Sequence, residues 1–281
     1  MSAVWFNGAL HEGPLAIAAG DRGLTLGDGL YETMLVAGRV ALWRNMHLAR
    51  MEGSARELGL AFTRSGVDGA IDTVLRQPFD GAQVLRITLT RGPAARGLAA
   101  SGGNPSLLVS LNDFDVSEMF QPATLITSSI RRSPSSPAAR MKTLSYIDNI
   151  AAAREAKARG MDDALLLNTD NCVAASTIAN IFLIKDKQLI TPSRDQGILT
   201  GVMRQSLLAV AHQQGFETRE RPVKPAELLK ADAVFLTNSL RFIRPIKSLD
   251  GAQLAQRDLT SLADALCETA RLQSGRDPRL L

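Results

Sequence analysis

Short apolar runs alternate with amphipathic stretches along the second half of this chain, and this pattern constrains the fold most. ALLLN at 164–168 and ANIFLIK at 179–185 have the length and the composition of buried strands. The stretches 146–159 and 200–214 show helical spacing, and a glycine follows each one, as is common where a helix ends. These elements do not follow a strict strand–helix–strand rhythm. The pattern therefore predicts an α+β fold rather than a doubly wound sheet.

The first half of the chain combines the same two kinds of element. The Gly38-Arg39 pair between two strand-like segments predicts a tight hairpin turn. We expect strands and helices in the following ranges: strands at 4–8, 31–36, 84–91 and 107–111, and helices at 47–58 and 66–76.

Two stretches are rich in Gly, Pro, Ser and Ala, at 92–106 and 131–140. Such stretches form loops over a site or linkers between domains. We place the domain boundary between them, where NDFDVSEMFQ interrupts the strand pattern. The predicted organisation is a first domain at 1–115, a linker at 116–125 and a second domain at 126–281.

The composition narrows the class of protein. With 45% hydrophobic residues among 281, the chain can bury a substantial core. The net charge is +4, but the basic residues form no tract and aromatic residues are few, which argues against nucleic-acid binding. No apolar stretch has the length of a membrane span, and the N-terminal residues do not form a secretory signal. We therefore expect a soluble cytoplasmic protein without a membrane or nucleic-acid partner.

The cysteines and histidines indicate neither a metal centre nor a catalytic triad. Cys172 and Cys267 lie far apart, with no CxxC motif or Cys/His cluster around them, so we expect neither a disulfide framework nor a metal site. His11, His47 and His212 have no Ser or Cys arrangement around them that would form a triad. We expect these histidines to be surface or structural residues.

One lysine lies at a position where chemistry is possible. Lys142 stands in RMKTLSYIDN, directly after a predicted loop and before a predicted helix. A lysine that is desolvated at such a junction has a lowered pKa, which is what a Schiff-base lysine needs. On position alone, an ordinary surface lysine is the more common alternative.

Several segments could bind an anion. GILTGVMRQ at 197–205 places two glycines ahead of a helix, whose free N–H groups and dipole favour phosphate. Ser239 ends a strand in LTNSL, and the guanidinium groups of Arg50 and Arg96 could each grip an anion by two hydrogen bonds. Taken singly, each feature could also be an ordinary helix start, turn or surface arginine.

The order of these motifs resembles that of the class IV (fold-type IV) pyridoxal-phosphate enzymes, from residue 5 to residue 251. This group includes branched-chain aminotransferases, D-amino-acid transaminases and aminodeoxychorismate lyase. The resemblance is carried by these segments: GDGLYET (27–33), HLARM (47–51), TRGPAARG (90–97), MKTLSYIDN (141–149), ANIFLIKDKQLITP (179–192), GILTGVMR (197–204) and FLTNSLRFIRPI (235–246).

The resemblance implies a small N-terminal α/β domain, a linker and a larger C-terminal domain with a barrel-like sheet. Pyridoxal phosphate (PLP) would bind between them in a homodimer, with the neighbouring subunit helping to line the site. By motif position, Lys142 would form the Schiff base and move the Cα proton. The other implied roles are phosphate binding by Arg50, Val202, Met203 and Ser239, and substrate binding by Tyr31, Arg96 and Leu240.

Four positions depart from the pattern of the relatives. The most important is Ala175, where most relatives have a glutamate that hydrogen-bonds the pyridine nitrogen of the cofactor. Without this carboxylate, the ring should be a weaker electron sink. The other departures concern the substrate more than the cofactor: Leu98 replaces a histidine of D-amino-acid transaminases, Met203 a threonine, and Ser145 a frequent asparagine.

The resemblance leaves three functions open. The first is transfer of an amino group between an amino acid, of D or branched-chain type, and a 2-oxo acid. The second is an aminodeoxychorismate lyase that forms 4-aminobenzoate and pyruvate, favoured by GVMRQ, TNSL and the Arg96-Gly97 pair. The third is a PLP-binding protein with little catalysis, because Ala175 lacks the carboxylate.

Overall fold

The computed structural model describes residues 4–99 and 104–281. Contacts divide the chain into two compact units, which we call unit 1 and unit 2. Unit 1 comprises the chain up to Val116 together with Met141–Ser145 and Ala270–Leu281. Unit 2 comprises Ser117–Arg140 and Tyr146–Thr269. The five residues around Lys142 are thus grouped with the N-terminal part of the chain, and the domain limits expected from the sequence stay a prediction.

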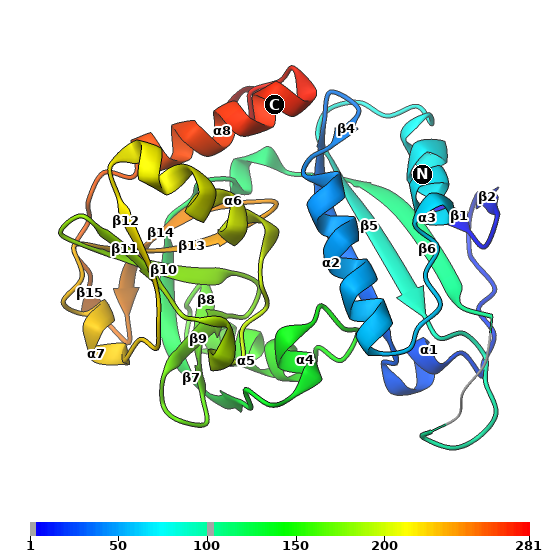
Figure 1. The fold of residues 1–281 in the computed structure, drawn as a ribbon, viewed down its shortest axis with the longest axis horizontal. Helices are drawn as coiled ribbons and strands as arrows, with labels where there is room; N and C mark the ends of the chain where they lie inside the picture. The colour runs from blue at the N-terminus through cyan, green and yellow to red at the C-terminus, as the bar shows by residue number, and fades with distance from the viewer. Residues whose placement is uncertain (1–3, 100–103) are drawn as a thin grey trace. The chain divides into compact units, whose positions relative to one another are not determined.

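Unit 1 contains a six-stranded antiparallel sheet in the order β2-β1-β6-β5-β3-β4. Figure 1 shows α2 and α3 lying against one face of this sheet. The elements have these bounds: β1 (Val4–Phe6), β2 (Ala9–His11), α1 (Arg22–Leu26), β3 (Gly29–Ala37), β4 (Val40–Ala41), α2 (Arg44–Glu57), α3 (Arg64–Leu75), β5 (Gln83–Thr90) and β6 (Ser106–Asp113).

The core of unit 1 follows from two sequence periods. In β5 every second residue is buried, so Leu85, Ile87 and Leu89 face one side. On α2, Leu48 and Met51 are three residues apart and meet the same layer. Burying each of these large side chains contributes roughly 1.5–3 kcal/mol. The two periods therefore fix which face of the sheet the helices cover.

The turn between β3 and β4 confirms the predicted hairpin. Gly38 and Arg39 both have positive φ, at 53° and 66°. This is the backbone conformation that a two-residue turn needs to match the twist of its strands. Val36 pairs with Ala41 across it.

Unit 2 is built on a nine-stranded mixed sheet in the order β12-β11-β10-β13-β14-β7-β8-β9, with β15 beside β14. The terminal strand β9 also contacts β10, so the sheet curls, which confirms the barrel-like sheet and the α+β class. The strands have these bounds: β7 (Ala123–Arg132), β8 (Asp163–Asn168), β9 (Val173–Ser176), β10 (Asn180–Lys185), β11 (Gln188–Thr191), β12 (Glu217–Glu220), β13 (Ala233–Asn238), β14 (Phe242–Leu249) and β15 (Ala252–Gln253).

The helices of unit 2 cover this sheet. Ala152 and Ala156 of α5 pack against Ile126 and Leu166, and α6 contacts β13. The helices that lie wholly in unit 2 have these bounds: α4 (Pro137–Arg140), α5 (Ile147–Ala158), α6 (Val202–Ala211) and α7 (Pro225–Leu228), with 3₁₀ turns at Arg194–Gln196 and His212–Gln214. Helix α8 (Thr260–Ser274) and the 3₁₀ turn Val116–Glu118 contain residues of both units, and the 3₁₀ turn Pro278–Leu280 belongs to unit 1. Among the described residues, no helix is both long enough and apolar enough to cross a membrane.

The segment 131–140 differs from the sequence expectation. The composition predicts a loop or a linker there, but β7 continues to Arg132 and α4 begins at Pro137. The strand continues because β7 lies between β14 and β8, and Arg131 and Arg132 still pair with Leu167 and Asn168. Pairing within the sheet overrides the polar composition of this segment. The other expected loop, 92–106, is described except for residues 100–103.

Candidate functional site

Lys142 is held by backbone pairing to the first residues of β3. Tyr31 N donates to Lys142 O at 2.9 Å, and Leu144 N donates to Gly29 O at 2.9 Å. Thr143 forms an antiparallel bridge with Leu30 between these two bonds. Because β4 pairs only with the far end of β3, the start of β3 has an edge that this segment can join. The fold therefore fixes the backbone of Lys142 beside Tyr31.

The side chains of Lys142 and Tyr31 also meet. Lys142 Nζ lies 4.3 Å from the centroid of the Tyr31 ring, and Arg86 Cζ lies 4.1 Å from the same centroid. Both distances are within the range of a cation–π interaction. The structure thus places Lys142, which was predicted to form the Schiff base, beside Tyr31, which was predicted to bind the substrate.

The next residue of β3, Glu32, is turned to the other face of the strand and binds two residues of α2. Arg50 Nε donates to Glu32 Oε1 at 2.8 Å, and Arg50 Nη2 donates to Glu32 Oε2 at 2.7 Å. His47 Nδ1 lies 2.6 Å from Glu32 Oε2. Glu32 and His47 are each only 1% exposed. The arginine that was predicted to bind phosphate is therefore part of a buried ionic cluster.

The charges of this cluster follow from its contacts. Burial alone would raise the pKa of Glu32, but the charge of Arg50 and the contacts with His47 lower it to about 2. Burial lowers the pKa of His47, against the attraction of Glu32, and the charges of Arg50 and Lys142 lower it further. Near neutral pH, Glu32 is thus an anion and His47 a neutral imidazole that donates Nδ1–H to it.

Glu32 and His47 were not among the residues with predicted roles. The signal for Glu32 was present in the sequence, because a lone carboxylate interrupts the apolar strand GLYETMLVA. A buried charge is retained only where it is paired, so such a residue indicates a partner. The partner itself, His47 three residues before Arg50, was not deducible from the strand. The three histidines were predicted to be surface or structural residues; His47 is buried, and His11 and His212 are exposed.

The predicted phosphate-binding turn in unit 2 requires a glycine. A Cβ added to Gly201 would lie 2.1 Å from Asn180 Oδ1. Asn180 Nδ2 in turn donates to Leu199 O at 2.8 Å and so holds the turn before α6. Gly201 is the N-cap of this helix and has no side chain to accept from the amides of Val202 and Met203. These amides can bind an anion beyond the helix end, where the helix dipole favours negative charge.

Ser239 and Leu240 follow a turn made by Asn238. Asn238 Oδ1 accepts from Leu240 N at 3.0 Å and from Arg241 N at 2.8 Å. This local turn fixes the backbone directly after β13. Both Ser239 and Leu240 are half-buried, so their side chains are partly accessible to a small molecule.

Ala175 lies on β9 opposite Leu166 and is buried. All four residues of β9 are buried, and the strand offers no carboxylate. The departure seen in the sequence is therefore located in the sheet of unit 2, at an apolar position. The predicted residues divide between the units as follows: Lys142, Arg50, Tyr31 and Arg96 in unit 1, and Ala175, Val202, Met203, Ser239 and Leu240 in unit 2.

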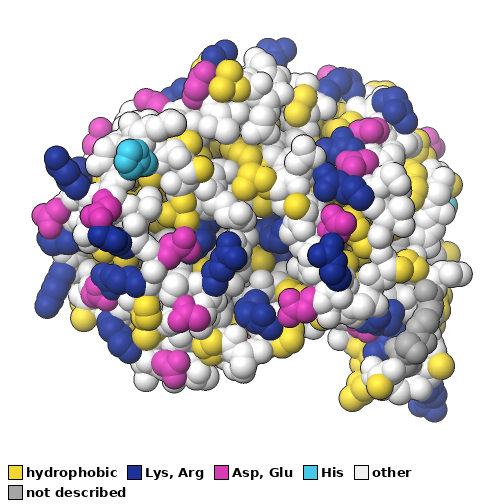
Figure 2. Space-filling model, viewed as in Figure 1, with side chains coloured by type: hydrophobic (Ala, Val, Ile, Leu, Met, Phe, Trp, Pro, Cys, Tyr) yellow, Lys and Arg dark blue, Asp and Glu magenta, His cyan; other side chains and the backbone are white. Residues whose placement is uncertain are grey.

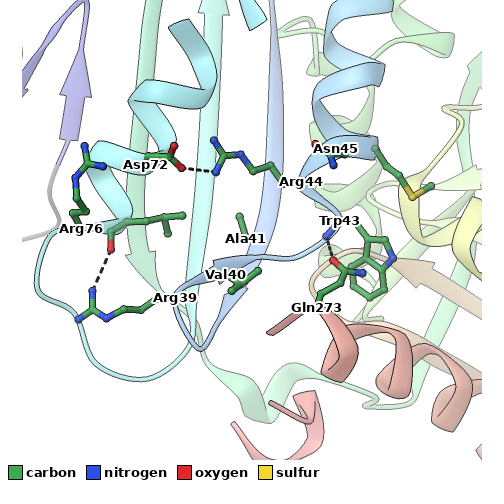
Figure 3. A pocket seen from close by; sticks show the side chains of 11 residues that line it. Arg39, Val40, Ala41, Trp43, Arg44, Asn45, Asp72, Arg76 and Gln273 are labelled. Atoms are coloured by element: carbon green, nitrogen blue, oxygen red, sulfur yellow. Dashed lines mark hydrogen bonds and ion pairs between the residues drawn. The ribbon is translucent and has the colours of Figure 1, made fainter. Parts of the chain in front are cut away.

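A separate pocket of about 980 Å³ in unit 1 contains none of these residues. Figure 3 shows that Arg44 points toward Asp72 and that Gln273 lies beside Trp43. Arg44 Nη1 donates to Asp72 Oδ1 at 2.5 Å, and Trp43 N donates to Gln273 Oε1 at 2.7 Å. On the face drawn in Figure 2, basic and acidic side chains are interspersed and form no continuous basic tract.

Each unit by itself contains residues of the kinds that would hold a phosphate-bearing cofactor linked to lysine. In unit 1, Lys142 supplies an amine and Arg50 a cation fixed by a buried carboxylate. In unit 2, the start of α6 supplies a glycine turn followed by backbone amides. Two buried polar atoms of the same unit as Lys142, His47 Nε2 and Thr143 Oγ1, have no hydrogen-bond partner within the described residues. These features of the separate units, with the curled mixed sheet of unit 2, are those expected of a fold-type IV enzyme.

The comparison with known proteins agrees with this class. The chain belongs to the class IV aminotransferases, because the family model described as "Amino-transferase class IV" matches residues 29–249. A structure from Legionella pneumophila, provisionally described as a 4-amino-4-deoxychorismate lyase, is 32% identical with a TM-score of 0.84, covering 91% of this chain and 96% of that one. A D-alanine aminotransferase of Bacillus licheniformis is 28% identical over 255 residues, or 88% of each chain.

Pyridoxal phosphate is the cofactor of this family and hence of this chain. A hypothetical aminotransferase from Mycobacterium tuberculosis in a PLP-bound form has the same fold, with a TM-score of 0.86 and 24% identity over 95% of this chain and 98% of that one. The chain is thus an enzyme of a family that contains both aminotransferases and lyases.

Proposed function

We propose that the protein is an aminotransferase that moves an amino group between an amino acid and a 2-oxo acid. The observation that carries this proposal is the placement of Lys142, whose Nζ lies 4.3 Å from the Tyr31 ring at the edge of β3. A lysine held in this way by backbone pairing presents its amine in one orientation, which proton transfer requires.

Arg50, Val202, Met203 and Ser239 are the residues that we propose to bind the phosphate of the cofactor. Arg50 brings a permanent charge, and Glu32 fixes the plane of its guanidinium group. The amides of Val202 and Met203 and the hydroxyl of Ser239 supply neutral donors. When bound, PLP supplies an electron sink that makes the Cα proton of an amino acid acidic.

Lys142 is the residue that we propose to move the proton. Its Nζ would take the proton from Cα of the amino acid and would later return a proton to a carbon atom of the reacting molecule. The ring of Tyr31 lies against this amine and limits its positions. Arg96 would bind the substrate carboxylate by two parallel hydrogen bonds, with Leu240 lining the substrate pocket. The substrate class is an amino acid of D or branched-chain type.

Ala175 bears on the rate of this reaction. A buried alanine cannot accept a proton from the pyridine ring, so the chain lacks the carboxylate that most relatives place here. A weakly active PLP-binding protein is therefore a third candidate. We expect slow but measurable transfer.

The second candidate function is an aminodeoxychorismate lyase, and the 32% identity to the Legionella protein favours it. The first step at Lys142 would be the same removal of the Cα proton. Lys142 would then protonate the leaving pyruvyl group, so that the products are 4-aminobenzoate and pyruvate. The sequence motifs GVMRQ and TNSL and the Arg96-Gly97 pair also favour the lyase.

We also propose that the enzyme works as a homodimer. Leu24, Leu26 and Leu98 are large apolar side chains that are exposed in the single chain, and a second copy could cover them. Light scattering after gel filtration would measure the mass directly. A particle of one chain mass would contradict this proposal.

The test of the function is a panel of D- and L-amino donors added to the PLP-loaded enzyme. Transfer predicts loss of the visible absorbance of the lysine-linked cofactor and appearance of the matching oxo acid. No change with any donor would contradict the aminotransferase. Release of 4-aminobenzoate from aminodeoxychorismate would establish the lyase.

The variant Lys142→Ala tests the central residue. It should bind PLP without the lysine-linked absorbance and should lose both activities. Lys157→Ala, on the exposed face of α5, is the matched control and should behave as the parent protein. Survival of the lysine-linked band in Lys142→Ala would show that another lysine carries the cofactor.

A further inference from the structure

Arg22 is a buried arginine that has no role in the proposed cofactor or substrate site. It is 7% exposed and belongs to the short helix α1. Its Nη1 donates to Gly97 O at 2.8 Å, and its Nη2 donates to Leu98 O at 3.0 Å. Both carbonyls directly follow Arg96 in the chain. Arg22 therefore holds the backbone on one side of the proposed carboxylate-binding arginine.

The third contact of Arg22 is a shared carboxylate. Arg22 Nε donates to Asp28 Oδ2 at 2.9 Å. Arg91 donates to the same carboxylate, from Nε to Oδ2 at 2.7 Å and from Nη2 to Oδ1 at 3.2 Å. Burial would raise the pKa of Asp28, but the hydrogen bonds from Arg91 and Arg22 outweigh it and lower this pKa. Asp28 thus stays charged and anchors both arginines.

The other side of the loop is tied to the same short segment. Arg22 N donates to Gly92 O at 3.1 Å, and Asp21 bridges to Pro93. The carboxylate of Asp21 accepts from Thr90 Oγ1 at 2.9 Å and from Ser106 Oγ at 2.7 Å, so the segment is itself bound to β5 and β6. The backbone that carries Arg96 is therefore fixed before and after this residue.

The residues between these ties do not hold the loop by themselves. Arg96 is exposed, and Leu98 is 84% exposed, so no packing of these side chains within the same chain positions the loop. Gly97 has φ of 121°, a conformation that other residues rarely adopt. Without Arg22, this short glycine-containing segment would have several accessible backbone conformations.

We propose that Arg22 is a positioning residue for substrate binding, which acts by fixing the backbone at Gly97 and Leu98 and so orienting Arg96. The proposal rests on the proposed function, in which Arg96 binds the substrate carboxylate. A loop that must be ordered when the ligand binds weakens binding by the cost of that ordering. The effect falls on substrate affinity and leaves the proton-transfer group Lys142 in place.

Arg91 provides a matched control for Arg22. Both arginines bind Asp28, and both donate to two backbone carbonyls. Arg91 donates to Gly59 O at 2.9 Å and to Leu58 O at 2.8 Å, at the end of α2. Arg91→Met therefore removes the same kinds of bond as Arg22→Met but releases a different segment. Any difference between the two variants reports on the loop and not on the loss of a buried arginine.

The experiment compares Arg22→Met, Arg22→Lys and Arg91→Met in the PLP-loaded enzyme with the best amino donor of the panel. We expect Arg22→Met to raise KM about tenfold and to leave kcat within about twofold of the parent value. A tenfold change in affinity corresponds to a modest change in binding free energy. Arg22→Lys, which keeps the charge but not the fork of donors, should lie between it and the parent. Arg91→Met should change KM less than about twofold.

Amide hydrogen exchange of the segment 93–99 gives a readout independent of turnover. Arg22→Met should accelerate exchange there, and Arg91→Met should not. Equal effects of the two variants on KM would overturn the proposal, since they would reflect a general loss of stability. Faster exchange without a change in KM would also overturn it, because Arg22 would then hold the loop without orienting a binding group. If Arg22→Met does not fold, the Arg22→Lys measurement decides by the same criteria.

Arg96→Met and the double variant Arg22→Met/Arg96→Met separate this inference from the function on which it rests. If Arg22 acts through Arg96, the double variant should have the KM of Arg96→Met within about twofold, because the effects of coupled residues do not add. Fully additive effects would overturn the proposal. An unchanged KM in Arg96→Met would instead show that Arg96 does not bind the substrate, a failure of the proposed function that leaves the exchange result for Arg22 standing.

Discussion

Both carboxylate oxygens of Glu32 accept hydrogen bonds from Arg50, at 2.8 and 2.7 Å. A two-pronged pair of this kind fixes the plane of the guanidinium group as well as its position. The carboxylate comes from β3 and the arginine from α2, so the pair also joins the sheet to the helix. The fold therefore orients the guanidinium group of Arg50, which we propose to bind the cofactor phosphate, before any ligand binds.

Glu32→Gln should weaken both the fold and cofactor binding. The amide cannot accept from both nitrogens of Arg50, which leaves a buried cation partly unpaired. Breaking a buried pair on one side costs about 3–5 kcal/mol, and we expect a loss of this order in the free energy of unfolding of the apoprotein. PLP affinity, measured by fluorescence titration, should fall about tenfold. Glu52→Gln, at an exposed position of the same helix, is the control; equal losses in both variants would contradict the role of Glu32.

His47 should make the stability depend on pH below neutrality. Its pKa is lowered from the ordinary 6.5, so the unfolded chain binds the proton more readily than the folded one. Stability is therefore full above about pH 6.5 and falls as the pH drops below it. Urea unfolding of the parent and of His47→Asn, whose amide can still donate to Glu32, should show this slope only in the parent. A slope of the same size in both proteins would assign it to another group.

Glu32 should add a second, more acidic loss of stability. Its pKa is depressed from 4.5 to about 2, so its contribution is present above pH 4.5 and is lost as the pH falls toward 2. This depression corresponds to about 3 kcal/mol. At matched stability near neutral pH, acid unfolding followed by circular dichroism should therefore be displaced to lower pH in Glu32→Gln, because the variant lacks the carboxylate whose protonation destabilises the parent. A superimposable acid transition would contradict the depressed pKa.

Ala175→Glu should have opposite effects with and without the cofactor. In the apoprotein it buries a carboxylate at an apolar position, which should lower the free energy of unfolding by about 1–3 kcal/mol. With PLP bound, the carboxylate can pair with the pyridine nitrogen and should raise the rate of amino transfer. Ala174→Glu, at the neighbouring buried position, should destabilise without raising the rate. An unchanged or lower rate in Ala175→Glu would mean that another group already serves the ring nitrogen.

Gly201→Ala should disrupt the turn before α6. Its Cβ would lie 2.1 Å from Asn180 Oδ1, so Asn180 must move and release Leu199 O. We expect PLP affinity to fall about tenfold, with stability lowered by about 1–3 kcal/mol. Gly69→Ala in α3, where an added Cβ meets no atom within 4 Å, should instead be neutral or stabilising. Unchanged PLP affinity in Gly201→Ala would argue against phosphate binding at this turn.

The sequence by itself determined the local elements and the class of enzyme. Helices such as α5 and α6 and strands such as β8 and β10 are visible because their periods lie within a few consecutive residues. The motifs around Lys142 and Arg50 indicated the family, which the match over residues 29–249 confirmed. The individual roles of these residues remain predictions, since family membership does not test them.

Only the tertiary structure decided which residues hold the candidate site in place. The pairing of the Lys142 segment with β3 joins residues more than a hundred positions apart, and the contacts of Arg22 with Gly97 and Leu98 span 75 and 76 positions. No local period records such distant partners. The same reason explains why β7 continued through a polar segment expected to be a loop, because its neighbours β14 and β8 supply its hydrogen bonds. Pairing between distant strands and burial of Glu32 and Arg22, rather than local propensity, place the residues on which the chemistry is proposed to depend.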